Sequence, residues 1–510
     1  MGGLAVAVER RLSGWDREGV GRRVWERDVT VWADPGTPEI ENRLGWLRLP
    51  TSMAERVDDW VGFADTIDDV DDVVLCGMGG SSLAPEVFDA TLRAEGRPRL
   101  AIADSTHPDA VAALTDRLDP GRTLFIVSSK SGGTLETLSL FRHFWAWRSA
   151  AGGRAGDAFV AVTDPGSTLA ALADERGFRR TFLAPPDVGG RFSALTDFGM
   201  VPAALVGVDV GRVLDGAAGM AAACGPGIGD LENPGLWLGA MLGEAALAGR
   251  DKATFVVPPE LAGLGAWLEQ LVAESTGKEG TGIVPVVDEP LRAPGAYGDD
   301  RIFVAYRMDG SAADPRLDAL EAAGHPVVRI PVDQANAIGA EMFRAELATA
   351  AAGAVLGINP FDQPDVEAAK ASARGLMDGD APAPDLPPRL DADALTEVLG
   401  ALGEGGYVAV QAYLPEEPPA EVVEALRSAT TAPVTVGIGP RFLHSTGQLH
   451  KGGSPGCVAL QLVDEPSRDV PIPETDLTFG RVVAAQAAGD AEVLRGRGRM
   501  VVRRSVGKKT

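Results

Sequence analysis

Short apolar runs alternate with helical patterns along the first part of the chain. Residues 73–76 and 124–127 are apolar at every position, and each run leads through a loop of small residues into a helical pattern. A run that is apolar throughout is typical of a strand buried on both faces of a sheet. The segments "RLAIAD" and "AFVAVTD" add two more short strands that end in aspartate. This alternation predicts a parallel, doubly wound α/β sheet.

The same plan repeats from about residue 236. The helical pattern "GLGAWLEQLVAES" precedes the strand patterns "RIFVAYRM" and "HPVVRIPV", and the helical pattern "GAEMFRAELATAAAGAVLG" follows them. The stretch "DGDAPAPDLPPRLDADA" is rich in Pro and Asp with almost no large apolar residues, which is typical of a linker. The remainder, from "YVAVQAYL" to "RMVVRRSVG", mixes strand and helix patterns once more.

A chain of 510 residues, 45% of them hydrophobic, should form roughly three compact units. The patterns predict an N-terminal helical segment (1–50), a first α/β domain (51–225), a second α/β domain (226–377), a linker (378–394) and a smaller C-terminal α/β unit (395–510).

The charge of the chain narrows the class of partner. A net charge of −25 argues against binding to nucleic acid or to an anionic membrane. A small anionic substrate therefore needs a locally positive pocket.

The three cysteines are far apart and fit neither a disulfide framework nor a paired metal site. No run reaches eighteen apolar residues, so we expect a soluble, cytoplasmic protein.

Two loops of small residues follow the first and third predicted strands. "GMGGSS" and "SSKSGGT" each precede a helix, where backbone N–H groups and the helix dipole suit a phosphate. The first loop also resembles a dinucleotide fingerprint, but Ser82 stands at the third glycine position and no ribose-binding acid is evident about twenty residues on. The alternative is that both loops are ordinary strand-to-helix turns.

Glu274 stands where a helical pattern calls for a hydrophobic residue. The apolar positions of this helix recur at the spacing of a buried face: Leu264, Trp267, Leu268, Leu271 and Val272. Glu274 continues that face, and Gln270 lies one turn before it. A carboxylate at the edge of an apolar face suits a general base. The alternative is that the helix frays before Gly277, so that Glu274 points to water.

Several segments together resemble one family, glucose-6-phosphate isomerase. "VGGRFSALTDFGMVP", "ESTGK" and "NPFDQPDVEAAK" are similar to its signature segments, and the loops "GMGGSSLAP" and "SSKSGGTLET" are similar to its sugar-phosphate-binding segments. The resemblance spans about residues 71–377. It implies two sugar-isomerase (SIS) domains, each an α/β/α sandwich, with an active site between them that is completed across a homodimer. The remainder, with "HSTGQLHKGG", is similar to the isomerase half of transaldolase–isomerase fusions, although no transaldolase portion is present.

The resemblance also implies roles for particular residues. Glu274 matches the base that moves a proton between C2 and C1 through a cis-enediol intermediate, Arg191 matches the cation that stabilises the enediolate, and Lys370 matches the lysine that assists ring opening. The substrate-binding residues that it implies are Gly79, Ser81, Ser129, Lys130, Ser131, Thr134, Gln270 and Gln363. Taken alone, Arg191 could be a surface arginine and Lys370 a solvated lysine.

The histidine that opens the sugar ring is the least certain assignment. The family places this histidine between the base and the lysine, but only His325 lies there in this chain, in a helix-to-strand turn. The segment "FLHSTGQLHKGG" is more similar in sequence to the family's histidine segment, and it carries His444 and His450. We favour His444 as the catalytic residue, and the other two histidines remain open.

The reaction that the resemblance implies is the reversible isomerisation of glucose 6-phosphate to fructose 6-phosphate. It needs a positioned base, a cation near the oxygens and a ring opener, with no metal or organic cofactor. One alternative is a broader phosphosugar isomerase that also accepts mannose 6-phosphate. Another is a sugar-phosphate-binding regulator that has lost the chemistry. A nucleotide-dependent oxidoreductase is disfavoured by the incomplete glycine fingerprint.

Overall fold

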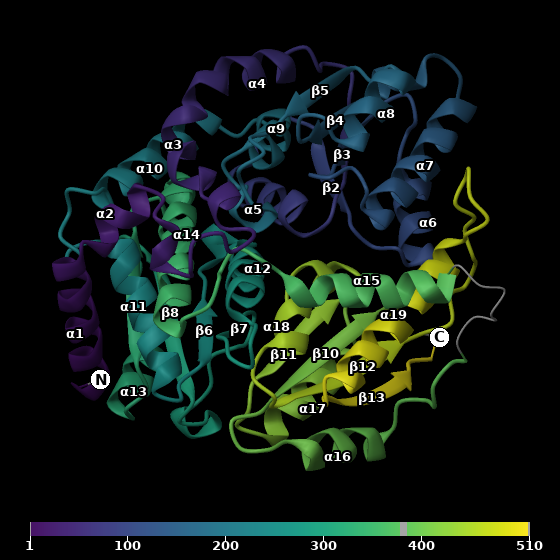
Figure 1. Ribbon diagram of the computed structural model, residues 1–510. Coiled ribbons are helices and arrows are strands. Elements are labelled where there is room, and N and C mark those ends of the chain that lie inside the picture. The colour runs from purple at the N-terminus through teal and green to yellow at the C-terminus, as the bar shows by residue number, and fades with distance from the viewer. Residues whose placement is uncertain (1, 378–384, 508–510) are drawn as a thin grey trace.

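The computed structural model describes residues 2–377 and 385–507, with side chains throughout except at 366–371 and 373. The described residues form three parallel sheets of five, four and four strands. Figure 1 shows the first sheet at the top, the second at the lower left and the third at the lower right. The α/β fold predicted from the apolar runs is confirmed.

The first sheet has the strand order β2-β1-β3-β4-β5. Its strands are β1 (Asp72–Cys76), β2 (Arg99–Ala103), β3 (Thr123–Ser128), β4 (Phe159–Thr163) and β5 (Arg180–Leu183). All residues of β1, β3 and β4 are buried, as expected for central strands of a parallel sheet. The order reverses between β1 and β3, so the loops after these two strands open at the topological switch point, where such sheets bind ligands.

Helices connect these strands and pack against the sheet. They are α4 (Val57–Ala64), α5 (Leu83–Leu92), α6 (Pro108–Arg117), α7 (Leu135–Ala150), α8 (Thr168–Arg176) and α9 (Asp197–Leu205). Of these, α5 and α7 follow the two loops at the switch point.

The second sheet repeats the plan, with the order β7-β6-β8-β9. Its strands are β6 (Lys252–Val256), β7 (Val284–Val286), β8 (Arg301–Met308) and β9 (Val327–Val332). Its helices are α10 (Val210–Ala223), α11 (Pro234–Leu247), α12 (Leu264–Thr276), α13 (Pro315–Ala322) and α14 (Ile338–Leu356).

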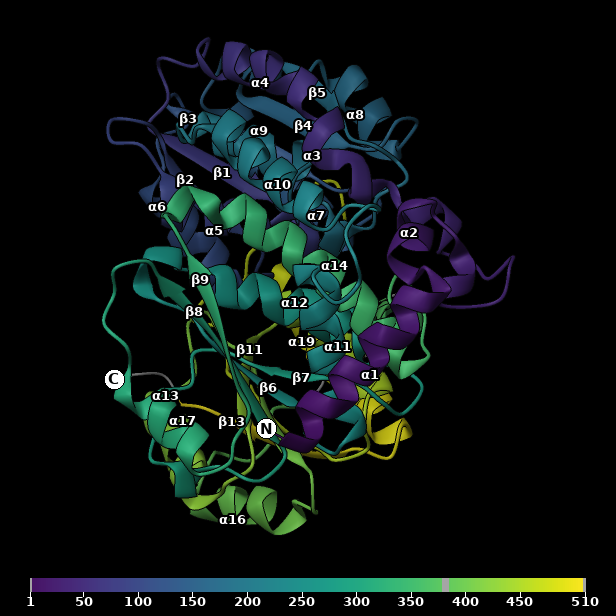
Figure 2. The ribbon, with the colours of Figure 1, turned by 90° about the vertical axis from the view of Figure 1, so that its left-hand side faces the viewer.

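The N-terminal segment packs on this second unit. Its helices are α1 (Gly2–Glu18), α2 (Val20–Trp25) and α3 (Leu49–Ser52). Figure 2 shows α1 running alongside α11, where Arg11 Nε donates to Glu244 Oε1 at 2.6 Å. Trp32 Nε1 donates to the carbonyl of Ala350 in α14 at 2.8 Å. The segment therefore packs directly against the second unit.

The third sheet has the order β11-β10-β12-β13. Its strands are β10 (Tyr407–Tyr413), β11 (Val434–Ile438), β12 (Cys457–Val463) and β13 (Met500–Ser505). The helices around it are α15 (Pro364–Met377), α16 (Ala392–Ala401), α17 (Ala420–Ala429), α18 (Gly447–Gly452) and α19 (Phe479–Gly496), with the short 3₁₀ turn η11 (Arg441–His444) before α18. Figure 1 shows α15 beside α19, so the last helix before the predicted linker already packs on the third unit.

Part of the predicted linker (378–394) is ordered, and 378–384 lie outside the described residues. Leu390 N donates to the carbonyl of Ser505 at 2.8 Å, which places this stretch along the edge strand β13. The Asp391 side chain accepts from Ala394 N and caps α16. The end of the predicted linker is thus bound to the third unit through backbone hydrogen bonds to the edge strand and through the helix cap.

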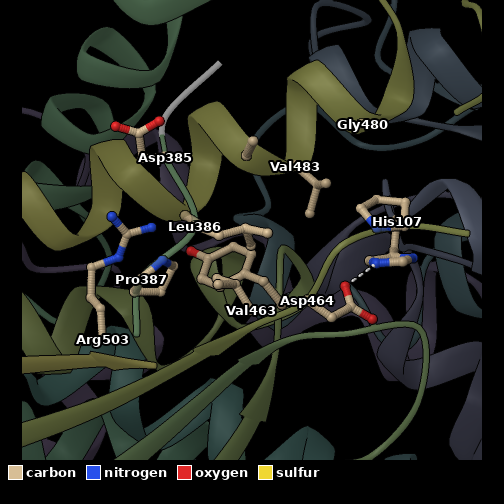
Figure 3. Close-up of a pocket in the computed structure, with 13 residues that line it drawn as sticks. His107, Asp385, Leu386, Pro387, Val463, Asp464, Gly480, Val483 and Arg503 are labelled. Carbon is tan, nitrogen blue, oxygen red and sulfur yellow. Dashed lines mark hydrogen bonds and ion pairs between the residues drawn. The ribbon is translucent and has the colours of Figure 1, made fainter. Parts of the chain in front are cut away.

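The third unit is fastened to the first by polar contacts. His107 Nε2 lies 2.8 Å from Asp464 Oδ1, and Figure 3 shows the Asp464 carboxylate turned toward the His107 ring. Ser467 N donates to Asp109 Oδ2 at 2.8 Å.

None of the described helices has both the length and the apolar character needed to cross a lipid bilayer. All three cysteines are buried and unpaired.

The buried ion pair between Arg301 and Glu289 should be important for the stability of the second unit. Arg301 Nη1 donates to Glu289 Oε2 at 2.8 Å and both side chains are fully buried. Arg301→Met leaves the Glu289 carboxylate without its main partner, so we expect a loss of about 3 kcal/mol in the free energy of unfolding, measured by urea denaturation. The control is Arg329→Met on the next strand, whose ion pairs with Asp318 and Glu321 are exposed and should cost less than about 1 kcal/mol. Equal losses in the two variants would contradict this account.

Candidate active site

Glu274 lies in the last turn of α12, inside the protein. The helix continues to Thr276, and Glu274 is 9% exposed. Thr276 Oγ1 donates to the carbonyl of Val272 at 2.8 Å and accepts from Ile283 N at 2.9 Å, which ties the helix end to the following segment. The alternative that the helix frays and turns Glu274 to water is therefore wrong.

Arg191 pairs with Glu274 across the two sheets. It comes from the 3₁₀ turn η7 (Gly190–Phe192) after β5, and its Nη1 lies 3.4 Å from Glu274 Oε1. The same Nη1 donates to Gln363 Oε1 at 2.9 Å, and Nε donates to Ser275 Oγ at 2.7 Å. Arg191 is 3% exposed, so the alternative of a surface arginine is wrong. Burial lowers the pKa of Arg191, while the Glu274 carboxylate opposes that shift.

The turn that carries Gln363 is held by two cations. Arg191 Nη2 donates to the carbonyls of Pro360 and Asp362, at 2.7 and 3.0 Å. Lys278 Nζ donates to the carbonyl of Asn359 at 2.7 Å and to Asp362 Oδ1 at 2.6 Å. Burial, followed by the Arg191 charge, lowers the pKa of Lys278 to about 8. The three signature segments predicted from sequence thus meet around Arg191.

Gln270 joins Glu274 to the third unit. Its Nε2 donates to Glu274 Oε2 at 3.1 Å and to the carbonyl of His444 at 2.8 Å. Gly79 packs against the same pair, since a Cβ there would stand 2.5 Å from the His444 carbonyl oxygen and 2.7 Å from Gln270 Nε2. The structure thus explains why glycine stands at position 79: a side chain would displace His444.

His444 is paired with a carboxylate that the sequence reasoning missed. His444 Nε2 lies 3.0 Å from Oε1 of Glu136, in the first turn of α7. Gln486 Nε2, from α19, donates to the same oxygen at 2.7 Å. Glu136 is buried at the same helical face as Leu140 and Phe144. A carboxylate on an apolar helix face was the signal that singled out Glu274, and it would have found Glu136 too.

The other two candidate histidines lie elsewhere. His325 packs against the rings of Tyr297 and Phe303 in the second unit. His450 is enclosed in the third unit, where its Nδ1 lies 2.9 Å from the Tyr407 hydroxyl. Of the three candidates, His444 is the one linked to Glu274, because Gln270 Nε2 donates both to the Glu274 carboxylate and to the His444 carbonyl.

The two predicted phosphate loops lie side by side at the switch point of the first sheet. Ser128 Oγ donates to the carbonyl of Ser81 at 3.3 Å, which links one loop to the other. Within the second loop, Ser129 Oγ lies 3.1 Å from Thr134 Oγ1 and accepts from Gly132 N at 3.1 Å. Hydroxyls and backbone N–H groups are thereby gathered at the start of α7.

The remaining predicted residues of this region have clear positions. Lys130 Nζ donates to Asp164 Oδ2 at 2.5 Å, so its ammonium is neutralised within the protein and its backbone is left to face the loop. Ser131 Oγ accepts from Gly133 N at 3.2 Å. Lys451, next to His450, forms a fully buried ion pair with Asp490 at 2.5 Å, so its ammonium does not face these loops. Lys370 lies in α15, and its side chain falls outside the described part of the structure.

The fold and the site define a doubly wound α/β protein with a buried carboxylate–guanidinium pair between two sheets and hydroxyl-rich loops beside it. The chain matches the family described as phosphoglucose isomerase over residues 26–289. It is 32% identical to the glucose-6-phosphate isomerase of Rubrobacter xylanophilus over 72% of this chain and 94% of that protein. It is also 32% identical to a probable glucose-6-phosphate isomerase of Natronomonas pharaonis over 61% of this chain and 80% of that one. The chain belongs to the phosphoglucose isomerase family.

Solved structures show the same fold. A hypothetical protein of Thermus thermophilus superposes with a TM-score of 0.66 at 26% identity, over 74% of this chain and 98% of that one. A glucose-6-phosphate isomerase of Chlamydia trachomatis superposes with a TM-score of 0.54 at 22% identity, over 70% of this chain and 78% of that one. The parallel α/β architecture of the chain is accordingly that of sugar-isomerase proteins.

His450 should act on acid stability rather than on catalysis. Burial, followed by the charges of Lys451 and Arg499, lowers the pKa of His450 to about 3. The unfolded chain binds this proton below about pH 6.5 and the folded protein does not, so stability is lost as the pH falls from 6.5 toward 3. In His450→Asn, the loss of unfolding free energy between pH 7 and pH 5 should be about 2 kcal/mol smaller than in wild type. Urea denaturation at the two pH values tests this, and an unchanged difference would rule it out.

Proposed function

We propose that this chain interconverts glucose 6-phosphate and fructose 6-phosphate through a cis-enediol intermediate, with Glu274 as the base. The observation that carries the proposal is the buried contact of Glu274 with Arg191 and Gln270. A carboxylate held by two neighbours keeps one geometry, which proton transfer between adjacent carbons needs.

The proton is removed from C2 of the open-chain aldose and returned to C1. As Glu274 takes the C2 proton, negative charge develops on the oxygens of the enediolate. Arg191 is fixed by five contacts, so it meets this charge without reorganising. Glu274 then returns the proton to C1 while the hydroxyl proton passes from the C2 oxygen to the C1 oxygen, so the ketose is an isomer of the aldose with no atom gained or lost.

Ring opening is assigned to His444, with Lys370 as the proposed assistant at the far end of the sugar. One ring nitrogen of His444 is engaged by Glu136, which orients the imidazole. The other nitrogen is left to exchange a proton with the ring oxygen. This division of roles follows the general arrangement in which a carboxylate positions a catalytic histidine.

The phosphate is assigned to the loops at the start of α7. Ser81, Ser129, Ser131, Thr134 and the Lys130 backbone supply hydroxyl and N–H donors there, and the N-terminus of a long helix adds partial positive charge. A protein with a net charge of −25 attracts an anion only through such a local site.

The proposal also covers the location, the cofactor use, the oligomeric state, the domains and the substrate range of the enzyme. We propose a cytoplasmic enzyme that uses no metal or organic cofactor and forms a homodimer. We propose that its C-terminal unit corresponds to the C-terminal unit in the isomerase half of transaldolase–isomerase fusions. We also propose that the domains of the chain begin at about residues 51, 226 and 395. Activity on mannose 6-phosphate is the alternative substrate range.

Replacing the base should abolish turnover while the fold is kept. We expect Glu274→Gln to lower kcat for fructose 6-phosphate about 10³-fold, because the amide keeps the size of the carboxylate and can still accept from Arg191 but cannot take a proton. Glucose 6-phosphate formation is followed with a coupled dehydrogenase assay. The control is Glu260→Gln, an exposed glutamate just before the same helix, which should retain wild-type rates. A wild type that binds sugar phosphates without turnover would support the regulator alternative instead.

The histidine should act within its own chain. His444 reaches Gln270 and Glu136 of the same chain, so an active site needs both Glu274 and His444 from one polypeptide. Co-expressed, differently tagged Glu274→Gln and His444→Ala chains should therefore show no more activity after double-tag purification than His444→Ala by itself. If the histidine were supplied by a partner subunit, half of the sites in a mixed dimer would regain both groups, and activity would rise clearly above that level.

A further inference from the structure

Arg441 links the catalytic histidine's turn to the first sugar-isomerase domain. It is the first residue of η11, three positions before His444 at the end of the same turn. Residues three apart lie on the same edge of a 3₁₀ turn. Its guanidinium forms a two-pronged contact with the carboxylate of Glu86 on α5, and its Nε lies 3.4 Å from Asp104 Oδ2 after β2.

The surroundings of Arg441 are strongly acidic. Besides Glu86 and Asp104, the carboxylates of Glu269 in α12 and Glu417 after β10 interact with its charge. Burial, followed by a nearby aspartate, raises the pKa of Glu269 to about 8. Arg441 therefore lies where all three α/β units meet.

We propose that Arg441 is a positioning residue for His444. The turn has two other attachments, since Gln270 holds the His444 carbonyl and Glu136 engages the ring. Neither attaches the start of the turn, and Arg441 supplies that third point. Without the guanidinium, the start of the turn loses its contacts with Glu86 and Asp104 and is no longer tied to the first domain.

Other ion pairs between the same two units lie away from this turn. Arg468 Nη2 lies 2.7 Å from Asp116 Oδ2 at an exposed edge, and His107 pairs with Asp464 beside the pocket of Figure 3. They fasten the third unit but do not touch the turn that carries His444. Arg468 therefore provides a matched control.

The inference rests on the proposed function, because it gives Arg441 a role only through the ring-opening residue. We expect Arg441→Ala to lower kcat/KM for glucose 6-phosphate about 10- to 100-fold, as displacement of a catalytic group by about 1 Å does. Arg441→Lys keeps the charge and should recover part of the loss. Arg468→Ala should remain at the wild-type rate.

A double-mutant cycle separates positioning from general support of the fold. Rates are measured for Arg441→Ala, for His444→Ala and for the double variant, with melting temperatures beside them. If Arg441 acts through His444, its removal costs nothing further once His444 is absent. The proposal is overturned if Arg441→Ala lowers the rate by the same factor in both backgrounds, or if Arg441→Lys is no better than Arg441→Ala.

Failure of the proposed function would look different. In that case Glu274→Gln would retain wild-type turnover, whatever the result of the cycle. Should Arg441→Ala fail to fold, the double-mutant cycle is measured with Arg441→Lys in its place. We then expect Arg441→Lys to lower kcat/KM by a smaller factor when His444 is present, and not at all in His444→Ala. A loss of equal factor in both would again overturn the proposal.

Discussion

The arrangement of the active site depends on the need to satisfy one buried guanidinium. Arg191 is almost fully removed from water, and an unpaired charge there would destabilise the fold strongly. It is satisfied by Glu274 and Ser275 from one signature segment and by the carbonyls and the amide of the 360–363 turn from another. The same contacts that stabilise the buried charge therefore bring together the proposed base, the proposed cation and Gln363. In this proposal, one set of hydrogen bonds serves both the fold and the reaction.

Close backbone approach is the second constraint, and glycine permits it. A Cβ on Gly277 would stand 2.4 Å from the Leu449 Cα, and a Cβ on Gly80 would stand 2.0 Å from the Gly190 carbonyl oxygen. The first contact seats α18 of the C-terminal unit against the end of α12, and the second seats the loop after β1 against the turn that carries Arg191. The C-terminal unit thus packs directly on the proposed active site, where Gln448 Nε2 also donates to the Gly277 carbonyl at 3.0 Å.

Much of the fold and of the site could be predicted from local patterns. Fully apolar runs marked the central strands, because a strand buried on both faces tolerates few polar side chains. Glu274 was visible as a carboxylate on an apolar helix face, and the loops after β1 and β3 were visible by their small residues. Glu136 carried the same signal as Glu274 but lay in a segment already assigned to phosphate binding.

By itself, the sequence predicted the central strands and the main helices, named candidate residues for the family's chemistry, and left few histidines, five in all, as candidates for ring opening. These follow from periodicity and residue type, which are local. Only the tertiary structure decided that His444, rather than His450 or His325, lies beside Gln270, that Glu136 pairs with it, and that the C-terminal unit brings it there within one chain. Such choices depend on contacts between residues more than 170 positions apart, which packing sets and no local pattern records.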